Sequence, residues 1–226
     1  MKLTYYGHSC FSVLVNDKHL LFDPYISPNE LARHIDVDQV KADYIFVSHG
    51  HDDHIADTGR IAHNNGSLVI SNFEIVNWFK NQGISNTHAM NIGGHWFFDF
   101  GKVKCVNAVH SSSMPDGSYG GNPMGFLVES DERSFYYSGD TALTYDMKLI
   151  GEFKKMNFAL FPLGNNFTMG IENAIIAADY IKCDTIIGLH YNTFGSIMID
   201  PAEAIDKFWR AGKDLLLPSI GETIDV

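Results

Sequence analysis

The chain is organised around the stretch Ser48-His49-Gly50-His51-Asp52-Asp53-His54. It follows residues 43–47, an apolar, aromatic and β-branched run that predicts a short buried strand. The cluster therefore stands where a strand ends and the chain turns. Imidazole and carboxylate groups together suit divalent metals such as zinc, iron and manganese. Ligands packed this closely on a turn cannot all reach one ion, so we expect His49 and His51 to face one ion. Asp53 and His54 would face a second.

A dinuclear site needs further ligands from distant parts of the sequence, and the chain offers them. Predicted strands over residues 103–109, 134–137 and 185–189 are each followed by a candidate: His110, Asp140 and His190, respectively. Taken singly, a histidine or aspartate at the end of a strand is more often an ordinary surface residue. For the 48–54 motif, the alternative interpretation is a solvated polar loop. Taken together, four strands that each end in candidate ligands predict that these side chains meet at one edge of a sheet sandwich.

Length and composition describe an ordinary globular chain of 226 residues, 45% hydrophobic and 19% charged. Because we find no linker, repeat or low-complexity segment, we expect residues 1–226 to form a single domain. The net charge of −11 argues against a nucleic-acid partner. No run approaches the ~20 apolar residues of a membrane span. Three cysteines without a C-x-x-C pair and an N-terminus without a signal core favour a cytoplasmic protein.

The order of the predicted elements indicates an α/β fold. Three short strands over residues 2–6, 11–15 and 19–22 open the chain as an antiparallel meander. Strands and helices then alternate, with helices expected over residues 55–63, 73–81, 144–155 and 171–181 and one that begins at Asp200 as N-cap. Further strands are expected over 67–71, 87–91, 95–100, 124–129, 158–161, 215–217 and 223–225. This order predicts two mixed sheets covered by helices.

The complete set of candidate ligands resembles the metallo-β-lactamase fold superfamily, whose hydrolases carry His-x-His-x-Asp-His and then His, Asp and His. The resemblance covers nearly the whole chain. It implies a four-layer αββα sandwich, with two mixed β-sheets flanked by helices and the site at one edge. It also implies a set of metal ligands: His49, His51 and His110 on metal one, Asp53, His54 and His190 on metal two, and Asp140 bridging both.

Finer matches resemble a small "metal-dependent hydrolase" family related to ascorbate-6-phosphate lactonases and, more distantly, to the phospholipase D that cleaves N-acylphosphatidylethanolamine. The matching stretches are 7–11, 110–113, 164–170 and 190–194. Two departures stand out. The chain lacks the extra length of the lactonases, and it has Gly195-Ser196 where prolines are expected.

The chemistry implied is hydrolysis by a metal-bound hydroxide, because two divalent ions that share a water lower its pKa from ~16 towards ~7. We expect two divalent metal ions as cofactors, with zinc as the leading candidate. Nitrogen and oxygen ligands also bind manganese, iron and nickel. As catalytic residues we predict Asp53, which would bind metal two and orient the hydroxide, and His8, which would enter the pocket as an oxyanion or substrate ligand. The alternative for His8 is a turn histidine that faces solvent.

Several supporting roles follow. Asp23 and Asp52 are candidates to accept a hydrogen bond from a ligand histidine. Asn166 and Thr168 are weaker pocket candidates, and loop 111–123, rich in small residues, is expected to form one pocket wall.

The predicted function is cleavage of a small ester, lactone or phosphoester. Its alternatives are a metal-dependent nuclease or phosphodiesterase of the same fold and a non-catalytic metal-binding member. The partner expected is a small-molecule substrate, with no nucleic acid and no membrane, and a homo-oligomer stays open.

Overall fold

The computed structural model describes residues 1–226 and contains two sheets, each of seven strands. The first sheet has the order β14-β1-β2-β3-β4-β5-β6. Its strands are β1 (Lys2–Gly7), β2 (Cys10–Val15), β3 (Lys18–Phe22), β4 (Tyr44–Phe46), β5 (Leu68–Ser71), β6 (Thr87–Ala89) and β14 (Thr223–Asp225). The second sheet has the order β13-β12-β11-β10-β9-β8-β7. Its strands are β7 (His95–Phe98), β8 (Gly101–Asn107), β9 (Met124–Glu129), β10 (Ser134–Tyr137), β11 (Phe158–Pro162), β12 (Thr185–Leu189) and β13 (Asp214–Leu216).

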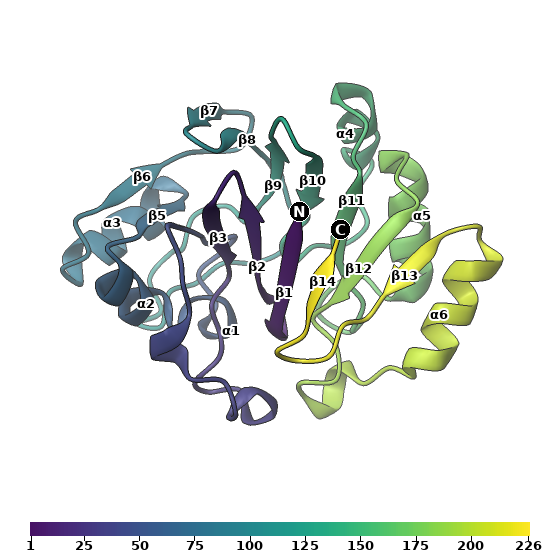
Figure 1. The fold of residues 1–226 in the computed structure, drawn as a ribbon, viewed down its shortest axis with the longest axis horizontal. Coiled ribbons are helices and arrows are strands. Elements are labelled where there is room, and N and C mark those ends of the chain that lie inside the picture. The colour runs from purple at the N-terminus through teal and green to yellow at the C-terminus, as the bar shows by residue number, and fades with distance from the viewer.

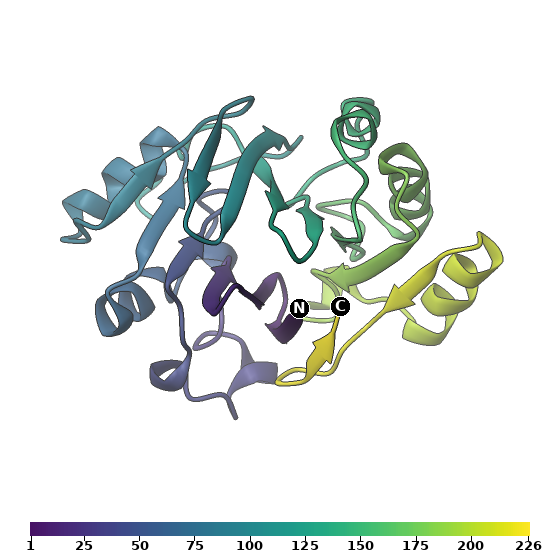
Figure 2. The same ribbon diagram turned by 45° about the horizontal axis from the view of Figure 1, so that its top comes forward.

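Helices cover the outer face of each sheet. Figure 1 shows α1 to α3 on one flank and α4 to α6 on the other, with the strands between them. The turned view in Figure 2 keeps the two helical layers on opposite sides. The helices are α1 (Asp52–Ile55), α2 (Thr58–Asn65), α3 (Phe73–Asn81), α4 (Met147–Phe153), α5 (Ile171–Ile181) and α6 (Pro201–Arg210). None of the helices is both long and apolar enough to cross a membrane.

Three layers of buried side chains separate these four layers of backbone. Between the two sheets lie rings such as Phe11, Phe22 and Phe46, whose successive centroids are 4.6 and 4.8 Å apart. Neighbours along a strand point to opposite faces, so Ile45 packs under the helices while Phe46 packs between the sheets. A third cluster joins the second sheet to α4, α5 and α6. The predicted αββα sandwich of two mixed sheets is therefore confirmed.

Strand directions explain why the candidate ligands meet. In the first sheet, β1 and β3 point the same way because each is antiparallel to β2, and β4 is parallel to β3. In the second sheet, β8 and β10 are each antiparallel to β9, and β11 and β12 are parallel to β10. The carboxyl ends of all strands that precede a candidate ligand therefore lie at one edge of their sheet.

Several predicted boundaries differ from the structure; the strands expected over 87–91 and 95–100, for example, cover Thr87–Ala89 and His95–Phe98. A single helix over 55–63 is wrong: helix α1 begins at Asp52, and the chain breaks before α2 because the Asp57 amide donates to the Pro24 carbonyl, at 3.0 Å, instead of continuing the helix. The strand expected over 103–109 ends at Asn107. The helix expected over 144–155 is shorter, covering Met147–Phe153.

Candidate metal centre

Six strand ends supply the site. The residues come from the β1–β2 turn and from the segments after β3, β4, β8, β10 and β12: His8, Asp23, residues 49–54, His110, Asp140 and His190. Two backbone hydrogen bonds join the sheets at this edge. The amide of His190 donates to the carbonyl of His8 at 2.9 Å, and the amide of Met124 donates to the carbonyl of Ser48 at 3.1 Å. These bonds hold loops from both halves of the chain together.

Three of the site residues have a left-handed backbone, with φ of 55° at His8, 42° at Asp23 and 52° at His190. For a residue with a side chain this conformation costs about 1–3 kcal/mol, and it persists only where the surroundings enforce it. All three stand directly after the last residue of a strand. The turns at this edge are thus strained so that each side chain points into the site.

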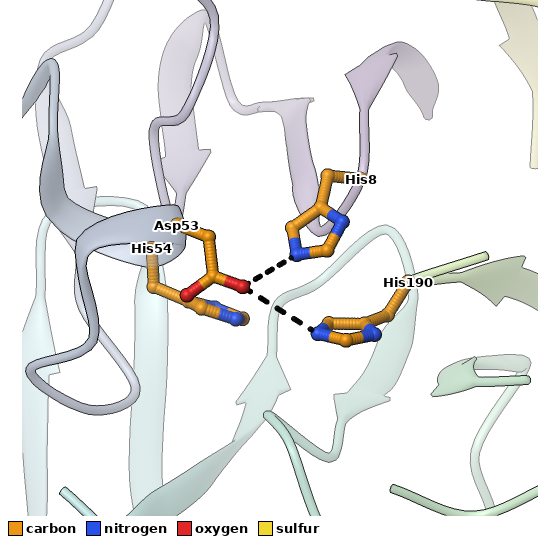
Figure 3. Close-up of side chains that lie close together, drawn as sticks. All are labelled: His8, Asp53, His54 and His190. Carbon is orange, nitrogen blue, oxygen red and sulfur yellow. Dashed lines mark hydrogen bonds and ion pairs between the residues drawn. The ribbon is translucent and has the colours of Figure 1, made fainter. Parts of the chain in front are cut away.

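A buried group of candidate ligands contains His8, Asp53, His54 and His190 (Figure 3). One potential ligand atom from each lies within 4.8 Å of the others. Asp53 stands between the two imidazoles that Figure 3 joins to it: its Oδ2 is 3.0 Å from His8 Nε2 and 3.8 Å from His190 Nε2. The three residues predicted for metal two, Asp53, His54 and His190, therefore lie together, and His8 lies beside them.

A second group contains His49, His51 and His110, whose ligand atoms also lie within 4.8 Å of one another. His49 Nε2 and His51 Nδ1 are 2.9 Å apart. Burial lowers the pKa of all three imidazoles, and for His49 the neighbouring His54 adds to the effect. Neutral imidazoles offer the lone pairs that a metal needs. This group is the predicted metal-one set.

Asp140 stands between the two groups. Its Oδ2 is 3.3 Å from His54 Nε2, 3.0 Å from His190 Nε2 and 3.7 Å from His110 Nε2. Burial would raise the pKa of this carboxyl, but His190 and His54 outweigh it and hold the pKa well below its usual value. Gly139, at φ +62°, permits the approach, because a Cβ there would lie 2.8 Å from the Met124 carbonyl oxygen.

The buried Asp23 fixes His54 from behind. Asp23 Oδ2 accepts from His54 Nδ1 at 2.8 Å, from the Tyr137 hydroxyl at 2.5 Å and from the Ser48 hydroxyl at 2.5 Å. The bond to Nδ1 leaves Nε2 of His54 directed towards Asp140. Asp23 therefore forms the hydrogen bond to a ligand histidine that was predicted for it. Asp52 is exposed and forms no hydrogen bond with any of the histidines.

His8 is enclosed rather than facing solvent or the cavity. The ionised Asp53 can only accept, so His8 Nε2 donates to it, and His8 Nδ1 accepts from the Thr193 hydroxyl at 3.0 Å. Burial and the neighbouring His190 lower the pKa of His8 to about 4, which keeps the ring neutral. This geometry directs His8 onto Asp53 rather than onto a substrate.

A cavity of about 360 Å³ opens onto the two groups. It is lined by His51, Asp53, His110, Ser111, Asp140, Phe167, His190 and Phe194. Loop 111–123 contributes Ser111 and packs directly on the histidine motif, where a Cβ on Gly50 would meet the Met114 sulfur and the Ser113 carbonyl. Asn166 and Thr168 do not line the cavity; the residue between them, Phe167, does.

The residues present fit divalent metal ions. His54 Nε2 and Asp140 Oδ1 are buried without a hydrogen-bond partner, which is costly unless something else occupies them. The candidate ligand atoms are all imidazole nitrogens and carboxylate oxygens, a set that zinc, manganese and iron accept.

Four contributors to the site were not predicted: Tyr137, Thr193, Phe167 and Phe194. Tyr137 ends a strand two residues before Gly139-Asp140, and its hydroxyl reaches Asp23 on the other sheet. No local pattern marks that contact. An apolar residue within the polar stretch 164–170 is a signal that could have singled out Phe167.

Comparisons with known proteins agree with this geometry. A family model described as a beta-lactamase superfamily domain matches residues 2–190. A UPF0173 metal-dependent hydrolase of Flavobacterium johnsoniae is 52% identical over 226 residues, covering 100% of both chains. One from Christiangramia forsetii is also 52% identical, over 227 residues and 100% of both chains. A metallo hydrolase of known structure, Igni18 from the archaeon Ignicoccus hospitalis, is 34% identical with a TM-score of 0.89, covering 99% of this chain and 97% of that one.

Proposed function

The chain belongs to the metal-dependent hydrolases of the β-lactamase superfamily, and from this premise we propose that it holds two divalent ions, zinc first, and cleaves a small ester, lactone or phosphoester. The observation that carries the proposal is the place of Asp140 Oδ2, within 3.7 Å of imidazole nitrogens from both groups. A carboxylate between two sets of ligands is suited to bridge two ions and to set their separation.

When bound, two such ions supply Lewis acidity and lower the pKa of a water that they share. The chain's own residues orient the reaction. Asp53 faces the cavity, with Oδ2 held by His8, and its Oδ1 accepts no hydrogen bond from the protein. We therefore propose that Asp53 Oδ1 orients the attacking water and receives its proton. His8 positions Asp53, and Thr193 in turn positions His8.

The cavity size supports a small-molecule substrate. About 360 Å³ lies within the range of pockets that enclose small ligands. The cysteines Cys10, Cys105 and Cys183 are all buried and unpaired, which supports a reducing, cytoplasmic compartment.

Elemental analysis of the purified protein tests the proposal, paired with hydrolysis of bis(p-nitrophenyl) phosphate and of a simple lactone. We expect about two metals per chain and turnover that a chelator abolishes and zinc restores. One metal or none, with no activity after zinc, manganese or nickel is added back, would instead indicate a non-catalytic member. Salt-sensitive RNA binding and cleavage would indicate a nuclease.

A further inference from the structure

The cavity wall divides into two parts. Five of its eight lining residues are candidate ligands: His51, Asp53, His110, Asp140 and His190. The other three, Ser111, Phe167 and Phe194, are left to contact the part of a substrate that does not react. All three are uncharged, and two are phenyl rings. None of the chain's 16 lysines and arginines lines the cavity.

The loop over residues 164–170 places Phe167 at the cavity. Its side chain is 57% exposed, although a phenyl ring gains free energy from burial. The preceding Asn165 and Asn166 have φ of 57° and 52°, and the Asn165 amide donates to the Met169 carbonyl at 3.0 Å. The buried Met169 in turn donates from its amide to the carbonyl of Thr141, next to Asp140. The backbone of the loop thus places an apolar ring at the mouth of the site.

Phe194 lies on the same cavity from the segment after His190. Its ring packs on His8 and Tyr25, with centroid distances of 5.3 and 6.4 Å, and 37% of the residue is exposed. Packing on His8 and Tyr25 fixes the ring's orientation while part of it still lines the cavity. Two phenyl rings from different loops therefore line the same small cavity, next to the two groups of candidate ligands.

We propose that Phe167 and Phe194 form an apolar subsite that selects uncharged carbonyl substrates, esters or lactones, in which an apolar group is attached near the reacting carbon. This inference rests on the proposed hydrolase function and narrows its substrate class. An apolar group gains free energy by covering the two rings. A phosphate monoester would gain no charge-assisted hydrogen bond from this wall, because the wall has no arginine or lysine to donate one.

The test compares methyl phenylacetate with methyl acetate on the zinc-loaded protein, with acid release followed by pH-stat titration. We expect kcat/KM to favour the phenylacetate. Phe167→Ala should reduce that preference by about tenfold or more, and Phe167→Leu should retain most of it. Phe97→Ala is the matched control: Phe97 is 70% exposed and does not line this cavity, so its loss should leave the preference unchanged. Metal content should be equal in all variants.

A second measurement does not depend on turnover. Saturation-transfer NMR of phenylacetamide should show binding to the metal-free wild type and weaker binding to Phe167→Ala, with phenyl phosphate giving no signal. Equal preference in Phe167→Ala and wild type, or phenylacetamide binding that the substitution leaves unchanged, would overturn the subsite. A protein that binds phenylacetamide through Phe167 but hydrolyses no ester with two metals bound would keep the subsite and reject the proposed hydrolysis.

Discussion

The two groups of candidate ligands lie side by side but are supported differently. In the buried group, His54 and Asp53 each have a hydrogen-bonded partner behind them: Asp23 holds the first and His8 the second. In the group of His49, His51 and His110, support comes from hydroxyls. Ser48 Oγ is 3.0 Å from His49 Nδ1, and Ser111 Oγ is 3.4 Å from His51 Nε2 at the exposed edge.

The two groups differ in the charge of the residues that support them and in the exposure of their histidines to solvent. A buried carboxylate such as Asp23 makes the imidazole it binds a stronger ligand and fixes its orientation, whereas a hydroxyl does so weakly. The side chain of His54 is fully enclosed, and that of His110 is 13% exposed to the cavity. We therefore expect the buried group to retain its ion when the other group has lost its own. Four substitutions test whether the two groups differ in this way.

The largest effect is expected from Asp140→Asn, because Asp140 is the residue that contacts both groups. Metal content and turnover should fall together, with turnover lowered by more than the ~10–100-fold cost of losing a residue that only supports a ligand. Metal analysis and hydrolysis rates measure this, with the exposed Asp146→Asn as control. Normal metal content in Asp140→Asn would reject the bridging role.

Asp23→Asn should weaken the buried group more than the other group, which Asp23 reaches only through the Ser48 hydroxyl. Since Asp23 accepts from His54 Nδ1, its charge supports that ligand, and we expect the affinity for one metal to fall by about 10–100-fold. Chelator titration with metal analysis would show one ion lost early. Asp52→Asn is a neighbouring control, and thermal unfolding of both variants separates metal loss from misfolding. Unchanged affinity for both ions would show that the contrast between the groups does not come from Asp23.

His8→Ala tests whether His8 acts through Asp53. Metal content should stay near normal while kcat falls by about tenfold, less than the ~10²–10⁴-fold expected for a direct general base. Thr193→Val should give a smaller decrease of the same kind, since Thr193 bonds the other nitrogen of His8. Loss of metal in His8→Ala would make His8 a ligand, and unchanged kcat would deny it any role.

Ser111→Ala should have the smallest effect. The contact with His51 is long and exposed, so its loss is worth the low end of the ~0.5–1.5 kcal/mol of a typical hydrogen bond, or about twofold in metal affinity. Isothermal titration with zinc measures this. A tenfold or larger loss would mean that the group of His49, His51 and His110 depends on Ser111 as much as the buried group depends on Asp23.

The sequence predicted the layers and, apart from His8, the residues that gather in the two groups of candidate ligands, because each candidate follows a strand whose apolar pattern is local. His49, His54, His110 and His190 all lie where strand order and direction bring them together. The boundary of α1 was wrong because the Asp57 amide bonds the carbonyl of Pro24 in a distant loop, which no helical periodicity records.

The supporting contacts were harder to predict because they cross from one sheet to the other. Tyr137 reaches Asp23, and Thr193 reaches His8, and in both pairs the partners are far apart in the sequence. Such contacts depend on how the sheets pack, not on any spacing within a motif. Phe167 was missed for a different reason: polar residues on both sides of it made its segment look like an ordinary loop.

The backbone hydrogen bond from His190 to His8 also constrains how the protein folds. Strand β14 closes the first sheet by pairing Lys2 with Asp225, so contacts of very large sequence separation complete both the sheet and the site. Folding rates fall as such separations grow, because chain entropy is lost before the contacts form. During synthesis the 49–54 motif emerges long before His190. The candidate ligands of this motif therefore stay without their partners until most of the chain has been synthesised.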